Sequence, residues 1–99
     1  MKITKTEFTR PAGLNQSSSW MVYLTKTHEE AQALHRFAMT QREMLTAING
    51  WHYSVSTSQV LQHCLVPEFF HDRGYFVTVI EHNNGDWEAP SKYELFIVD

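Results

Sequence analysis

THEEAQALHRFAMTQREMLTAING, residues 27–50, is the stretch that decides the fold. Thr27 precedes Glu30 by three residues, which is the spacing of a capping box. In that motif the threonine hydroxyl accepts from the Glu30 amide and the glutamate reaches back to the cap amide. Gly50 is placed to end the helix, because glycine tolerates the left-handed conformation that closes one. The stretch therefore predicts a single helix of about six turns, over residues 28–49.

The predicted helix has an apolar side and a polar side. Its apolar residues recur at three- and four-residue spacing and are Leu34, Phe37, Ala38, Met44, Leu45 and Ile48. Gln41 falls near the middle of this side, where it is either a satisfied core amide or a site residue. On the polar side, His28, His35 and Arg42 follow each other at seven-residue spacing. Met39 lies among them as an apolar exception. We predict ordinary solvated surface there, with partner binding by these four residues as the alternative.

Five further segments have strand composition, rich in β-branched and aromatic residues with turn residues between them. They are residues 2–10, 20–25, 51–57, 75–82 and 92–98. Residues 2–10 are charged and irregular, which is typical of an edge strand with a bulge. Residues 51–57 alternate as a half-buried strand does. The other three carry apolar side chains on both faces and so need cover on both.

Residues 58–66 fit either a short helix or a strand, with a slight preference for the helix, and Pro67 ends either one. Cys64 lies in this apolar run and is predicted to be a small core residue. The element order is then β-β-α-β-(short helix or strand)-β-β. We expect one α+β domain over residues 1–99, in which the long helix packs on one face of a mostly antiparallel sheet of four to five strands.

Composition narrows the class of protein. The chain has 99 residues, 42% of them hydrophobic, a net charge of −3 and a single cysteine. These values are typical of a globular domain in the reducing cytoplasm. No segment approaches the roughly 18 apolar residues of a membrane span, and the first residues do not resemble a signal peptide. Without a stripe of Lys and Arg, nucleic acid is not favoured as a partner.

The six histidines do not show the spacing of a metal site. Zinc ligands usually occur in pairs at short fixed intervals, and none is present here. His63 and Cys64 are adjacent, so their side chains point apart and seldom form an activated pair. Asp72 and Glu81 flank the strongest strand without the basic residue that a nuclease site needs. We therefore predict no metal, no cofactor and no catalytic residue.

The two-faced strands lead to the functional hypothesis. One helix covers one sheet face, so the other face needs residues 58–66, a second copy of the chain or a partner protein. We expect a non-enzymatic protein-binding module, with an inhibitor or immunity-type protein of phages or mobile elements as its nearest analogue. A homodimer is the commonest self-assembly. The alternatives are a nucleic-acid-associated protein and a small enzyme whose histidines and carboxylates meet only in the fold.

The loop at residues 83–90 is the predicted partner-binding segment. Trp87 stands between Asp86 and Glu88, with turn residues on both sides. Tryptophan is enriched at binding hot spots because its ring buries a large area and keeps a hydrogen-bond donor. The flanking acids would steer a basic partner surface. The alternative is that Trp87 folds back over the end of the core.

Overall fold

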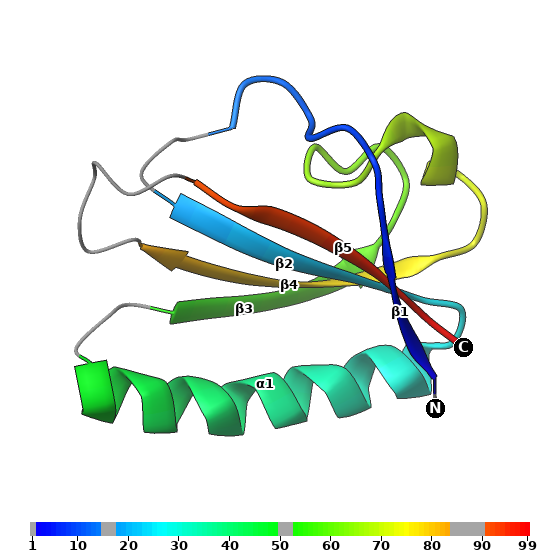
Figure 1. The fold of residues 1–99 in the computed structure, drawn as a ribbon. Coiled ribbons are helices and arrows are strands. Elements are labelled where there is room, and N and C mark those ends of the chain that lie inside the picture. The colour runs from blue at the N-terminus through cyan, green and yellow to red at the C-terminus, as the bar shows by residue number, and fades with distance from the viewer. Residues whose placement is uncertain (1, 15–17, 50–52, 84–90) are drawn as a thin grey trace.

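The computed structural model describes residues 2–14, 18–49, 53–83 and 91–99 and shows one long helix beneath a twisted five-stranded sheet (Figure 1). The elements are β1 (Ile3–Thr6), β2 (Ser18–Thr25), α1 (His28–Asn49), β3 (Tyr53–Gln59), the short 3-10 helix η1 (Glu68–Phe70), β4 (Phe76–Asn83) and β5 (Tyr93–Val98). The predicted α+β class and the predicted bounds of the helix are confirmed.

The sheet is mixed. Its strand order is β1-β5-β2-β4-β3. The pairs β1–β5, β2–β4 and β3–β4 are antiparallel, whereas β2 and β5 run parallel at its centre. The prediction of a mostly antiparallel sheet therefore holds for three of the four neighbouring pairs, and β2–β5 is the exception. Among the described residues, β1 and β3 pair on one side only and form the two edges of the sheet. β1 is the edge strand expected near the N-terminus, but it spans only Ile3–Thr6 and pairs with β5 in continuous register, without the expected bulge.

The helix begins at the predicted cap. The Glu30 amide donates to Thr27 Oγ1 at 3.2 Å. The Glu30 carboxylate differs from the expectation, because it accepts from the Thr27 hydroxyl at 2.8 Å and does not reach the cap amide. Gly50, the predicted stop, lies outside the described residues. No helix in the described part of the chain is long and apolar enough to cross a membrane.

The main core lies on the sheet face that points away from α1. Along β2, Trp20, Val22 and Leu24 face this side and are buried. The core also includes Val77 and Val79 from β4 and Leu95 from β5. The even and odd residues of β2 therefore separate onto two faces, as period-two alternation requires.

A second layer without regular strands covers this core face (Figure 1). Its main part is the connection from β3 to β4, which places Val60, Val66 and Phe70 in the core, and Leu14 from the segment between β1 and β2 packs against the same core. The preference for a helix at residues 58–66 is wrong: β3 continues to Gln59, and the Val60 amide still donates to the Tyr75 carbonyl at 2.9 Å. Burial of these separate side chains decides the path of the chain, and the weak local periodicity does not.

Cys64 is exposed, which contradicts its predicted core position. The backbone around it turns so that Val66 enters the core in its place. Three side-chain hydrogen bonds fix this turn: the Leu65 amide donates to His63 Nδ1, His71 Nε2 bonds the Val66 carbonyl at 2.9 Å, and the Tyr93 hydroxyl donates to the Leu65 carbonyl. Burial raises the pKa of Tyr93 to about 12, so its hydroxyl keeps the proton that it donates.

Candidate functional site

α1 covers only part of the sheet face against which it packs. Among the described residues, α1 contacts β3, β4 and β2 but neither β5 nor β1. The uncovered part forms a groove of about 650 Å³ along one flank of the helix. Its walls come from α1, from the three strands above the helix and from the edge strand β1, and they are Ile3, Met21, Tyr23, Ala33, Leu34, Phe37, Ala38, Gln41, Arg42, Tyr53, Thr78, Ile80 and His82.

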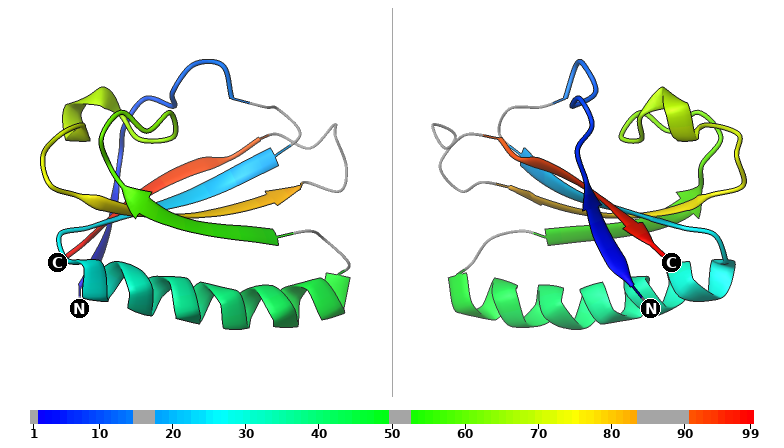
Figure 2. Two further views of the ribbon diagram at one scale, coloured as in Figure 1. Left: turned by 180° about the vertical axis from the view of Figure 1, so that it is seen from behind. Right: turned by 45° about the vertical axis from the view of Figure 1, so that its right-hand side comes forward.

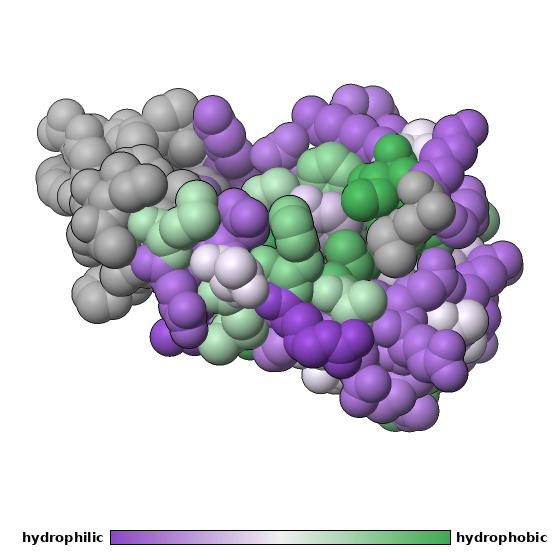
Figure 3. Space-filling model, turned by 90° about the horizontal axis from the view of Figure 1, so that it is seen from below, coloured by the Kyte–Doolittle hydropathy of each residue, from purple (hydrophilic) through white to green (hydrophobic). Residues whose placement is uncertain are grey.

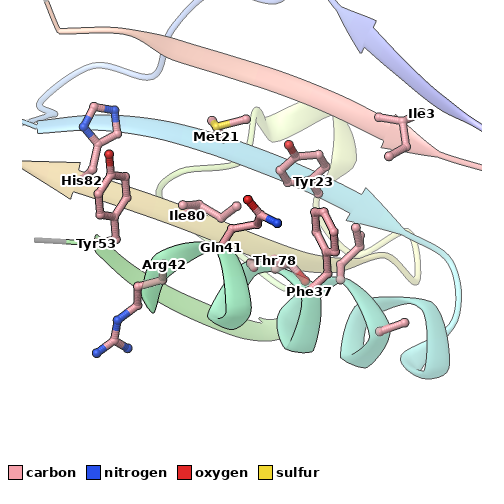
Figure 4. Close-up of a pocket in the computed structure, with 13 residues that line it drawn as sticks. Ile3, Met21, Tyr23, Phe37, Gln41, Arg42, Tyr53, Thr78, Ile80 and His82 are labelled. Carbon is pink, nitrogen blue, oxygen red and sulfur yellow. The ribbon is translucent and has the colours of Figure 1, made fainter. Parts of the chain in front are cut away.

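The groove has an apolar end and a polar end (Figure 4). Ile3, Tyr23 and Phe37 lie at the apolar end, and Tyr53 and His82 lie at the other. Such a distribution is usual in binding pockets, which combine an apolar lining with a few polar groups that set orientation.

Aromatic contacts hold the walls in place. Tyr23 stacks on Phe96 of β5 with ring centroids 4.7 Å apart, and the Tyr53 and His82 rings lie 5.4 Å apart. Burial and, to a smaller extent, the nearby charge of Glu94 raise the pKa of Tyr23. Its hydroxyl therefore remains a neutral donor at the rim of the groove.

Large apolar side chains border the groove without being covered. Phe37 is 64% exposed and Ile3 is 48% exposed. Met44, farther along α1, is also exposed. The sequence predicted Phe37 and Met44 for the buried side of the helix, and the structure corrects this. Figure 3 shows apolar residues gathered in the middle of this face, with hydrophilic residues beside them. A contiguous apolar surface of this kind marks interaction sites in soluble proteins.

Of the four predicted contact residues of α1, Arg42 lines the groove, and His28 and His35 lie on the other flank of the helix beside Thr57 of β3. His35 is half-buried, and its Nδ1 lies 2.8 Å from Thr57 Oγ1. That hydroxyl is 3.2 Å from Thr78 Oγ1, which donates to the Ala31 carbonyl at 3.3 Å. This chain of polar groups ties the helix to the sheet, so His35 has a structural role whatever else it does.

The remaining residues of that set are placed separately. His28 lies at the start of the helix, and its ring centroid is 5.5 Å from that of Phe76 in β4. Arg42 Nη1 lies 3.6 Å from Met39 Sδ, and the side chain of Arg42 also lines the polar end of the groove. Arg42 is thus the one predicted residue that the structure brings into the groove. Binding by His28, His35 and Met39 stays a prediction.

The predicted loop site lies outside the described residues. Asp86, Trp87 and Glu88 all fall within residues 84–90, so their role as partner-binding residues stays a prediction.

Two of the groups considered for catalysis, Glu81 and His63, have structural partners. The Glu81 carboxylate accepts from the Trp20 indole at 2.7 Å, and the Arg10 guanidinium lies over the same indole ring. Burial, and secondarily the proximity of His71, lower the pKa of His63. Within the described residues, no three His, Cys, Asp or Glu side chains are grouped so that they could hold a metal ion.

Sequence reasoning missed the groove as a site. It recognised that Met21 and Tyr23 form a second apolar face on their strand, but the lateral position of α1 decides whether that face is covered. Gln41 does line the groove, as the site-residue interpretation of this amide requires. Comparison of the chain with protein-family models, curated proteins and solved structures found no match.

Proposed function

We propose that the protein is a non-enzymatic binding module that takes an apolar segment of a partner protein into the groove between α1 and the sheet. The exposure of Phe37 at the rim of an apolar groove carries this proposal. Burial of one such side chain contributes about 1.5–3 kcal/mol, which the free protein does not gain. The module would act by occluding a surface of a larger protein, as inhibitor and immunity-type proteins do.

The charge of the groove indicates which chemical groups the partner segment carries. Arg42 is the single charged residue among the described residues that line it, and no carboxylate is among them. An interface usually surrounds an apolar centre with a polar rim. The partner segment therefore carries a large apolar side chain for the end near Phe37 and an acidic or other acceptor group for the end near Arg42.

A comparison of three immobilised proteins tests the proposal. Wild type, Phe37→Asp and Leu61→Asp are each exposed to a lysate of the native cells, and the retained proteins are quantified by mass spectrometry. Leu61 is a matched control, because it is 60% exposed but does not line the groove. Both substitutions lie on the surface and should change the free energy of unfolding by no more than about 0.5 kcal/mol.

The expected result is a protein that wild type and Leu61→Asp retain and Phe37→Asp loses. The same protein should then bind purified wild type directly, and Arg42→Glu should weaken that binding because it reverses the charge at the polar end. Equal retention by all three proteins would show that the groove is not the binding site.

A further inference from the structure

The two edges of the sheet differ in their protection against further strand pairing. β1 has four residues, and its Lys5 Nζ lies 3.3 Å from the Glu94 carboxylate of β5. Short length and a lysine are two of the means by which proteins prevent edge strands from pairing with other chains. β1 is therefore a protected edge.

β3, at the other edge, has neither protection. It runs for seven residues, YSVSTSQ, without a charged residue, a proline or a glycine. Its pairing with β4 extends from Tyr53 opposite His82 to Gln59 opposite Phe76. In an antiparallel pair the backbone groups of alternate residues point away from the partner. The hydrogen bond from the Val60 amide to the Tyr75 carbonyl fixes the alternation, so that the outward-pointing residues include Val55, Thr57 and Gln59. Figure 2 (left) shows this strand at the near edge of the sheet, and no described segment pairs with its outer side.

We infer that β3 pairs antiparallel with β3 of a second copy of this chain, so that the two sheets become continuous in a two-fold homodimer. Side chains at the centre of such a pairing face their own copies, and a charged strand would repel itself. β3 carries no charge to repel. Pairing centred on Ser56 places Val55 opposite Thr57 of the second copy, and β-branched residues are favoured in such cross-strand positions.

The position of α1 is consistent with this dimer. The two-fold axis of a continuous antiparallel sheet is perpendicular to it, so both helices lie on the same face. α1 lies mainly beneath β3 and β4. Neighbouring strands lie about 4.8 Å apart. If each helix is centred beneath β3 and β4 of its own chain, the axes of the two helices lie about 10 Å apart, which is a normal packing distance.

The helix flank next to β3 then becomes a second part of the interface. His35 on this flank is bonded to Thr57, which fixes the flank beside the strand. Met39 lies one turn farther along and is half-buried. In the dimer it meets the second helix, which accounts for an apolar residue on an otherwise polar side of α1. The apolar end of the groove is lined from the opposite flank by Leu34 and Phe37 and stays open, so this inference does not depend on the proposed function.

Light scattering coupled to size exclusion tests the dimer, with one substitution at each edge. Ser56 and Thr4 are both exposed strand residues. Wild type and Thr4→Lys should have twice the 11.6 kDa mass of one chain. Ser56→Lys should have the mass of one chain, because its two lysines face each other across the axis. Circular dichroism and a thermal melt establish that each variant is folded.

A crosslinking experiment makes the test independent of the stability of the lysine variant. Cβ atoms of directly opposed residues in an antiparallel pair lie about 4.5–5.5 Å apart. Ser56→Cys in a Cys64→Ser background should therefore give a covalent dimer with a short thiol-reactive crosslinker, and Thr4→Cys in the same background should not. A wild-type monomer at high micromolar concentration would overturn the inference. So would a dimer that neither Ser56→Lys disrupts nor Ser56→Cys crosslinks.

Discussion

Neighbouring residues of β2 lie in two different environments. Val22 and Leu24 face the second layer and are completely buried, whereas Tyr23 between them faces the groove and is half-buried. The same contrast extends across the sheet, because the irregular connection covers one face and α1 covers only part of the other. The two faces share their strands, so the difference comes from what covers them.

The dimensions of the covering elements explain the contrast. A helix of 22 residues is about 33 Å long but only about 10 Å wide. Five strands at about 4.8 Å spacing make a sheet about 20 Å wide. One helix laid along the strands therefore covers about half of the sheet. An irregular connection is not bound to one axis, so it can place Val60, Val66 and Phe70 over separate parts of the other face.

The largest expected effect compares the two faces directly. Leu24→Ala should lower the free energy of unfolding by about 2–5 kcal/mol, because it removes a completely buried side chain and leaves a cavity. Phe37→Ala removes a larger side chain from the groove and should cost no more than about 0.5 kcal/mol. Urea unfolding at one pH measures both. A cost for Phe37→Ala near that for Leu24→Ala would mean that the groove is closed in solution.

A smaller effect is expected where α1 is joined to the sheet. The Thr78 hydroxyl is buried and contacts both the Thr57 hydroxyl and the Ala31 carbonyl. Thr78→Val keeps the shape of the side chain but removes these hydrogen bonds, so the free energy of unfolding should fall by about 1 kcal/mol. Thr4→Val at the exposed edge strand is the control and should cost almost nothing. If both variants unfold at the same urea concentration, the polar chain does not hold the helix in place.

The parts of the fold that the sequence predicts are those set by neighbouring residues. The cap at Thr27 and the apolar spacing along α1 are local signals for the helix, and the β-branched and aromatic composition of residues 20–25 is a local signal for a strand. Both elements are therefore predicted correctly. The path around Cys64 depends on which side chains reach the core, and residues close in sequence carry little information about that.

The candidate site was less predictable for a related reason. Phe37 has the spacing of a buried residue, but α1 is displaced toward β3 and leaves its side chain at the rim. The hydrogen bond between His35 and Thr57 joins residues that are 22 positions apart in the sequence. No pattern within the helix alone could indicate which of its flanks would face the open half of the sheet.

The smallest expected effect is a pH dependence confined to the covered face. Burial and the nearby His71 lower the pKa of His63 in the folded protein. The unfolded chain, with a histidine pKa of about 6.5, therefore takes up a proton more readily than the folded chain does. Stability from this group is complete above that value and falls as the pH is lowered toward the folded pKa. We expect the urea midpoint to decrease between pH 7.5 and about pH 5.5.

His63→Asn should remove part of this decrease. The asparagine side chain does not titrate, yet its carbonyl oxygen can still accept from the Leu65 amide, as His63 Nδ1 does at 3.1 Å. Hydrogen exchange should locate the loss of protection in residues 60–71 and not in α1, because protonation loosens only the layer that contains His63. If the urea midpoint of His63→Asn decreased with pH as steeply as that of wild type, the titration of His63 would not contribute to the pH dependence of stability.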